Sequence, residues 1–255
     1  MRMHAQGLCF GYPHARTLAL RGAGAEIPSG SALALLGPNG CGKSTLLGTL
    51  IGAHVPSSGQ VLLGDRDLST LNAGETARLV AFLPQFERMG FAFTALEYTL
   101  LGRAPHIPVL NQPSREDEAA ALRALESAGA ADLAQRHVNE LSGGELQLVR
   151  IARCLAQETP AIVMDEPTSM LDPRHARMVA DAIRALSASG RTVVFSTHDA
   201  ALAAYAASKV ILMRDGRDIF QGSVDEALLP ARLEMCFDVA FGPSGAPSAF
   251  FRHEE

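Results

Sequence analysis

The sequence has no tryptophan, and aromatic residues make up only 5% of its 255 positions. It has 22 lysines and arginines against 27 aspartates and glutamates, with no basic cluster, which argues against a nucleic-acid partner. We find no N-terminal signal pattern and no apolar run of the ~18 residues that a membrane-spanning helix needs. The four cysteines lie far apart without a CxxC pair, so we expect reduced thiols rather than disulfides or a zinc site.

Apolar residues, in contrast, make up 47% of the chain, enough for a large core. Short apolar runs alternate with stretches of helical spacing, which predicts an α/β fold with a mainly parallel sheet. The first 31 residues are typical of antiparallel β structure, whereas 88–156 shows helical spacing only. We therefore predict a single domain over 1–255, in which 1–87 and 157–255 form the core and 88–156 is an inserted all-helical subdomain.

The spacing of apolar residues also predicts individual elements. We expect a hairpin of 209–213 with 218–220 around Asp215-Gly216. We expect strands at 7–10, 18–27, 32–36, 60–65, 80–85, 161–164 and 192–196. We expect helices at 72–78, 94–101, 114–127, 146–156, 173–188 and 200–207, and the run 46–51 can continue a helix that starts at the preceding glycine-rich loop.

Residues 37–45 fit the pattern G-x-x-x-x-G-K-[ST], between an apolar run and a helical run. Glycines without Cβ atoms let backbone N–H groups approach a polyphosphate, and the helix start adds partial positive charge. Lys43 can reach the β- and γ-phosphates, and the Ser44 hydroxyl can bind Mg²⁺. An ordinary glycine-rich turn is the alternative. The candidate phosphate-binding residues are Gly37, Pro38, Asn39, Gly40, Cys41, Gly42, Lys43, Ser44 and Thr45.

Asp165 and Glu166 follow the expected strand at 161–164, at the edge where open α/β sheets place their ligands. An aspartate there can hold Mg²⁺, and the adjacent glutamate can polarise the water that attacks the γ-phosphate. A turn or helix cap is the alternative, which the phosphate-binding loop earlier in the chain disfavours.

The stretch Ser142-Gly143-Gly144-Glu145 precedes another helical run. Ser142 is typical of an N-cap, and the two glycines leave the helix start bare, so we expect a second anion site. One chain has no evident use for two such sites. Two copies packed head-to-tail would place Ser142 of each opposite Gly40 of the other. A plain capped helix is the alternative.

The sequence resembles the ATP-binding-cassette ATPases over nearly the whole chain. The resemblance lies in the order and spacing of five motifs, which are the phosphate-binding loop, Gln85, 141–145, 164–166 and His198. The resemblance implies ATP and Mg²⁺ as ligands, with the metal on Ser44, Gln85 and Asp165. It implies that Glu166 is the catalytic glutamate, that His198 contacts the γ-phosphate, and that Lys43 and Gln85 assist them. Tyr12 resembles the aromatic residue that stacks on adenine. Ser142, Gly143, Gly144 and Glu145 resemble the signature that contacts the opposite subunit's ATP, and Asp172 ends a loop that crosses the dimer seam.

Three positions within these motifs stand out. Glu145 stands where the family usually has glutamine and Met170 where it has alanine, and we expect neither to touch the chemistry directly. Cys41 lies at a helix start, where its thiol pKa can be lowered, so that alkylation would block hydrolysis and ATP would protect. A small filler in a tight loop is the alternative for Cys41.

The chain carries one cassette, no coiled-coil arms and no membrane spans, which favours the separate ATPase subunit of an importer, peripheral on the cytoplasmic face of the cell membrane. Residues 91–97 and 101–106 are similar to ATPases of importers for iron-siderophores, haem, cobalamin and molybdate; we favour an iron-siderophore. The resemblance implies a homodimer, multi-span permease subunits docking near Gln85–Arg103 with Phe91 and Phe93 as anchors, and a periplasmic or lipid-anchored substrate-binding protein. Core packing is the alternative for the two phenylalanines. A regulatory ATPase outside transport, or a soluble binding module, is the alternative function.

Overall fold

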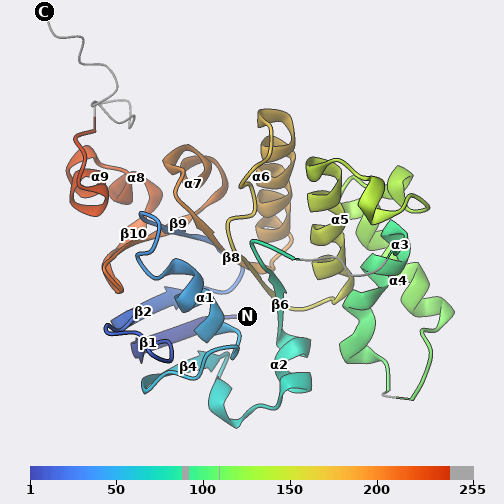
Figure 1. Cartoon of the computed structure of the whole chain (residues 1–255), viewed down its shortest axis with the longest axis horizontal. Helices are drawn as coiled ribbons and strands as arrows, with labels where there is room; N and C mark the ends of the chain where they lie inside the picture. Colours follow the sequence, from blue (N-terminus) through green and yellow to red (C-terminus); the bar gives the residue numbers. More distant parts are fainter. Residues whose placement is uncertain (88–91, 109, 242–255) are drawn as a thin grey trace, which may run out of the picture.

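The computed structural model describes residues 1–87, 92–108 and 110–241, and within them it contains two β-sheets (Figure 1). The larger sheet has the strand order β10-β9-β3-β8-β7-β6. Its strands are parallel except β10, which forms a hairpin with β9, so the predicted α/β fold with a mainly parallel sheet is confirmed. The strands are β3 (Ala32–Leu36), β6 (Val80–Leu83), β7 (Ala161–Met164), β8 (Thr192–Thr197), β9 (Lys209–Arg214) and β10 (Arg217–Ser223).

The smaller sheet is antiparallel, with the order β2-β1-β4-β5. Its first strand begins at Met3 rather than at residue 7, because buried Met3 and Ala5 continue the apolar face that Leu8 belongs to. A register shift between Ala5 and Leu8 hides this alternation in the sequence, with Gly7 at φ 62°. The strands are β1 (Met3–Phe10), β2 (Leu20–Ile27), β4 (Ser58–Leu63) and β5 (Arg66–Asp67).

Helix α1 (Lys43–Leu50) packs between the two sheets (Figure 1). Leu46, Leu47 and Leu50 belong to the same apolar cluster as side chains of β1 and β3. The opposite face of the larger sheet packs on α6 (Pro173–Ala188) and α7 (Ala200–Ala206). The remaining core helices are α2 (Ala73–Leu79), α8 (Val224–Ala227), α9 (Pro230–Phe237) and the 3-10 turn η1 (Leu68–Thr70).

A helical region lies at one end of the molecule (Figure 1). Its helices α3, α4 and α5 each begin with a capping box, in which a serine or threonine side chain and an acidic side chain bond each other's backbone N–H. The subdomain boundaries at 88 and 156 stay a prediction. The elements are α3 (Ala95–Leu100), η2 (Leu101–His106), α4 (Arg115–Ser127), η3 (Ala131–Leu133), η4 (Val138–Glu140) and α5 (Gly143–Ala156).

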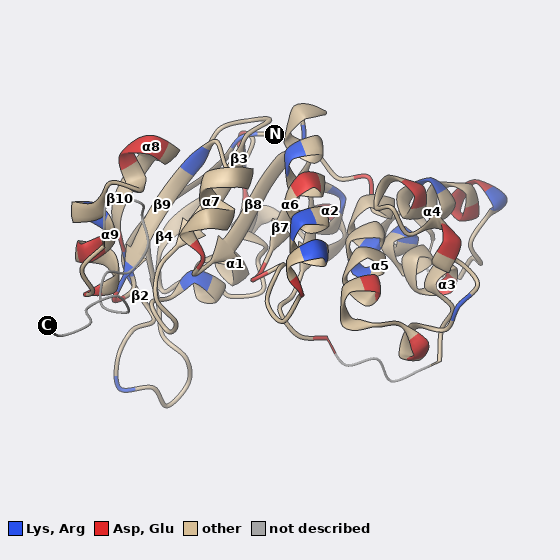
Figure 2. Cartoon of the chain, turned by 90° about the horizontal axis from the view of Figure 1, so that it is seen from above, with Lys and Arg blue, Asp and Glu red and all other residues tan. Residues whose placement is uncertain are grey.

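Acidic and basic residues are mixed along α4 and α6 (Figure 2). In the described ranges, we find no helix with the length and apolarity that crossing a bilayer requires. Four parallel strands, β3, β6, β7 and β8, end at the same edge of the larger sheet, because parallel strands in register share their carboxyl ends. The loops that follow these strands carry the phosphate pattern, Gln85, the two carboxylates and His198, respectively.

Candidate functional site

The loop between β3 and α1 is tight enough to require glycine at two positions. A Cβ atom on Gly37 would lie 2.3 Å from the carbonyl oxygen of Met213, and one on Gly42 would lie 2.8 Å from that of Ala19. Gly42 also has φ 108°, where residues with a Cβ are strained. The helix begins directly at Lys43, and its first N–H groups face the loop.

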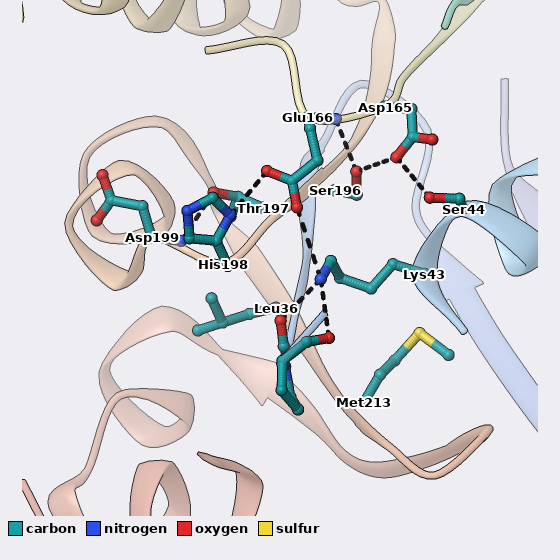
Figure 3. Close-up of polar contacts among 12 residues, drawn as sticks. Leu36, Lys43, Ser44, Asp165, Glu166, Ser196, Thr197, His198, Asp199 and Met213 are labelled. Carbon is teal, nitrogen blue, oxygen red and sulfur yellow. Dashed lines mark hydrogen bonds and ion pairs between the residues drawn. The ribbon is translucent and has the colours of Figure 1, made fainter. Parts of the chain in front are cut away.

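Lys43 lies at the centre of the site, and it is only 5% exposed (Figure 3). Its Nζ donates to the carbonyl oxygens of Gly37 at 2.7 Å and Pro38 at 3.1 Å. The same nitrogen lies 3.5 Å from Oε1 of Glu166, which is also buried. A buried ammonium group requires such partners, and phosphate oxygens offer the same kind of acceptor.

Asp165 links α1 to the sheet. Its Oδ1 accepts hydrogen bonds from the hydroxyls of Ser44, at 3.1 Å, and Ser196, at 2.5 Å. The Ser196 oxygen in turn accepts from the backbone N–H of Glu166 at 2.8 Å (Figure 3). Ser196 thus holds both carboxylate residues in place. Our sequence reasoning missed it, because nothing in the sequence shows which residue of β8 faces β7.

Glu166 and His198 form the second part of the site. Oε2 of Glu166 lies 3.0 Å from Nδ1 of His198, whose side chain is 57% exposed. Glu166 has φ 47°, a left-handed conformation that is uncommon for a residue with a Cβ. Glu166 is one of the residues that line a cavity of about 410 Å³. It is lined by Tyr12, Ala19, Asn39, Gly40, Gly42, Lys43, Ser44, Thr45, Gln85 and Glu166.

The signature residues do not line this cavity. Ser142 and Gly143 are exposed, whereas Gly144 is buried against the ring of His175 in α6, so our expectation of two bare glycines is wrong for Gly144. The Nδ1 atom of His175 lies 2.6 Å from the carboxylate of Asp172, which caps α6. The signature and the loop ending at Asp172 therefore form a second cluster within the chain.

Glu145 contacts the signature serine directly, in the capping box of α5. Its Oε2 accepts from the backbone N–H and the hydroxyl of Ser142, both at 2.8 Å. These bonds lower the pKa of Glu145, so its negative charge is held at the helix start. Arg136, 3.0 Å away, is its partner for ion pairing.

Two buried polar residues of α5 connect the helical region to the site, and our sequence reasoning missed both. Gln147 donates to the carbonyl oxygen of Pro167, just after Glu166, at 2.7 Å. Arg150 donates to Gln147 at 2.7 Å and to the carbonyl oxygen of Pro84, just before Gln85. In the sequence they are two polar positions of an amphipathic helix, which does not reveal their partners.

Cys41 does not fit the reactive thiol that we expected. Its side chain is only 4% exposed, and burial raises the pKa of the thiol, which outweighs the lowering effect of Lys43. The helix start therefore does not activate it, because desolvation of the thiolate costs more than the local positive charge returns. Its role as a small residue in a tight loop fits the structure.

The residues expected to dock a membrane subunit include exposed and buried side chains. Phe86 and Leu101 are exposed, whereas Arg103 is buried in ion pairs with Asp117 and Glu158. Phe93 packs against the core of the helical region, and Phe91 lies outside the described residues.

Comparisons with known proteins identify a family. The family model described as ABC transporter matches residues 20–169. The hemin import ATP-binding protein HmuV of Pseudomonas entomophila (strain L48) is 42% identical over 219 residues, which cover 84% of each chain. The cobalamin import ATP-binding protein BtuD of Halobacterium salinarum (strain ATCC 29341 / DSM 671 / R1) is 37% identical over 228 residues, covering 88% of this chain and 57% of that protein.

Solved structures show the same arrangement. A chain assigned to the metal-chelate type of ABC transporter, in an inward-facing conformation, superposes with a TM-score of 0.82 and 31% identity, covering 94% of this chain and 89% of that one. The dimeric post-hydrolysis structure of the ATP-binding cassette MJ0796, bound to ADP and Pi, superposes with a TM-score of 0.76 and 26% identity, covering 87% of this chain and 98% of that one.

Proposed function

This chain belongs to the ABC transporter family, and on that premise we propose that it is the ATP-hydrolysing subunit of an importer for a metal chelate. The observation that supports this most is that three groups meet around one cavity. They are the phosphate-binding loop, Ser44 with its hydrogen-bond partner Asp165, and Glu166 with its partner His198; Ser44 and Glu166 are the members of the two pairs that line the cavity.

The chain supplies a residue for each task in hydrolysis. The loop N–H groups and Lys43 would bind phosphate oxygens, and Tyr12 at the cavity rim would stack on adenine. Glu166, oriented by His198 and Lys43, would accept the proton of the attacking water. The donor set of Ser44, Gln85 and Asp165 consists of hard oxygen atoms, which fit Mg²⁺, and the bound ion would neutralise charge on the phosphates.

A second copy of the chain would complete the site. Ser142 and Gly143 are exposed and lie outside the cavity, so they are free to meet the nucleotide of another subunit. The superposition with a dimeric cassette that holds ADP and Pi supports a dimer, and we propose that its two copies pack head-to-tail. ATP would join the two surfaces, and its hydrolysis would release them.

A permease would dock on a groove of about 700 Å³ beside the helical region. The groove is lined by apolar residues from the core, such as Leu71 and Phe82, and from the helical region, such as Leu101. An amphipathic helix of the partner fits such a groove. The chain would then lie on the cytoplasmic face of the membrane, with a substrate-binding protein on the other side. Haem is the first cargo candidate because the relatives include proteins named for hemin import, and iron-siderophores, cobalamin and molybdate are the others.

The proposal is tested by reconstituting the chain with its co-purified membrane partner and binding protein in vesicles. We expect ATP hydrolysis to rise when the binding protein carries one of the four cargoes, each tested in a separate arm. The same complex with Glu166→Gln is the control and should stay inactive in every arm. Failure to co-purify with any multi-span membrane protein would instead favour a regulatory ATPase.

A further inference from the structure

The rings of Phe10, Tyr12 and His54 pack together, and Tyr12 lines the nucleotide cavity. The ring of His54 stacks on that of Phe10, with centroids 4.8 Å apart and an angle of 20° between the planes. Both rings meet Tyr12 edge-on, at centroid distances of 5.5 Å for His54 and 5.1 Å for Phe10. Such perpendicular contacts are favourable for aromatic pairs and fix their relative orientation.

His54 is itself fixed by α1. Its backbone N–H donates to the carbonyl oxygen of Gly48 at 3.1 Å. A Cβ atom on Gly48 would lie 2.4 Å from Cδ2 of the His54 ring, so the imidazole lies directly on the helix backbone. A glycine inside a helix is otherwise unfavourable, and the space that His54 needs explains this one.

The hydroxyl of Tyr12 adds two polar contacts. It lies 3.2 Å from the hydroxyl of Thr45, in the first turn of α1, and 3.4 Å from Nε2 of His54. The distance to Nε2 of His54 is at the long end of the hydrogen-bond range. The contact between the two rings, rather than this hydrogen bond, is therefore the main interaction by which His54 orients Tyr12. Without His54, the Tyr12 ring would keep one edge contact and one hydroxyl contact, in a loop whose residues 11–18 are exposed.

From this geometry we propose that His54 is a positioning residue that holds Tyr12 in the orientation in which its ring receives the base of the nucleotide. The inference rests on the proposed function, specifically on Tyr12 as the adenine platform. A ring that is already oriented loses less conformational freedom on binding, so the gain is in affinity for the base and not in the chemical step.

The test measures dissociation constants of the full-length protein for ATP and for inorganic tripolyphosphate, which has no base, together with KM and kcat. We expect His54→Ala to weaken ATP binding by roughly three- to tenfold, with tripolyphosphate binding and kcat unchanged. His54→Phe keeps a ring and should retain most of the affinity. His4→Ala, on β1, is the matched control and should behave as wild type.

A double-variant cycle separates this inference from the role of Tyr12. If His54 acts through Tyr12, the Tyr12→Ala/His54→Ala protein should bind ATP as Tyr12→Ala does. Wild-type affinity of Tyr12→Ala would overturn the proposed adenine platform. Weakened binding in Tyr12→Ala together with wild-type binding in His54→Ala would overturn only the positioning role, as would an equal loss for ATP and tripolyphosphate.

Gly48→Ala gives an independent check, because the added methyl group displaces the His54 ring without changing its chemistry. We expect this variant to weaken ATP binding as His54→Ala does. In the His54→Ala background the same substitution should have no further effect on ATP affinity and should raise the melting temperature, since alanine favours helix. Unchanged ATP affinity of Gly48→Ala in the folded protein would contradict the inference.

Discussion

Glu166 is held between two nitrogen-bearing side chains, with Lys43 at 3.5 Å from one carboxylate oxygen and His198 at 3.0 Å from the other. We predict that Glu166→Gln lowers kcat by roughly 10²–10⁴-fold, because the amide keeps the shape of the side chain but cannot accept a proton. ATP binding should be retained. Gel filtration with ATP should then show a trapped dimer, and a purely monomeric elution would contradict the shared-site model.

Glu145 provides a second prediction at the residue scale. Its carboxylate bonds the Ser142 hydroxyl, so in a head-to-tail dimer a negative charge lies close to the partner's triphosphate. Glutamine preserves a capping box without the charge. We predict that Glu145→Gln lowers the ATP concentration needed for half-maximal dimerisation by about two- to fivefold, measured in the Glu166→Gln background.

The control for this charge effect is Glu140→Gln, in the adjacent 3-10 turn η4. It removes the same charge from the helical region without changing the cap of Ser142. An equal shift in both variants would attribute the effect to net charge and not to the signature.

At the scale of single elements, α4 depends on its first turn. Asp117 accepts from the hydroxyl and the backbone N–H of Ser114 and pairs with buried Arg103, and these contacts, the hydroxyl first, lower the pKa of Asp117 to about 2. Because the folded-state pKa lies below the unfolded value, the resulting stability is present above about pH 4 and is lost as the pH falls towards 2.

We therefore predict that Asp117→Asn lowers the melting temperature by about 2–4 °C at neutral pH, and that the difference from wild type shrinks between about pH 4 and 2. Glu116→Gln, in the same turn, is the matched control and should shift little. The measurement is thermal unfolding followed by circular dichroism across this pH range. A difference that stays constant down to pH 2 would contradict the assignment.

At the same scale, the sequence predicted elements better than their ends. Gly42, in a left-handed conformation, allows α1 to begin directly at Lys43. The buried face of β1 extends back to Met3 across a register shift that interrupts the alternation. In both cases the backbone conformation of one glycine decides where the element begins.

At the scale of the whole molecule, the proposed head-to-tail dimer gives each copy two half-sites, the phosphate-binding loop and the signature, and both are completed by the same second copy. A Cβ on Gly143 has no atom within 4 Å, so Gly143→Asp should leave the fold of its own chain intact while placing a charge against the partner's phosphate. Lys43→Ala impairs the phosphate-binding loop instead. We predict that each variant alone is inactive as a homodimer. Gly143→Asp impairs the signature in both sites, and Lys43→Ala impairs the phosphate-binding loop in both sites.

Mixing the two variants in equal amounts should restore about a quarter of wild-type activity, because half of the dimers are mixed and each mixed dimer has one intact site of two. The measurement is ATP hydrolysis as a function of the mixing ratio. No recovery on mixing would contradict the head-to-tail model, and full activity of Gly143→Asp alone would remove the signature from the site.

The sequence by itself determined the local chemistry of this protein. The loop at 37–45, the caps at Ser114 and Asp172, and the carboxylates after β7 depend on residue types at fixed spacings, and spacing is what a sequence contains. These features fixed the fold class and the family. They also predicted most residues of the cavity.

Only the tertiary structure decided which side chains that are distant in sequence contact each other, and how exposed to solvent they are. Ser196 joins both carboxylates, Arg150 reaches the loop before Gln85, and His54 lies on Gly48 because packing brings these elements together. The same packing buries Cys41 and so reverses the direction of its expected pKa shift. Contact and burial are properties of the assembled core, and no spacing along the chain determines them.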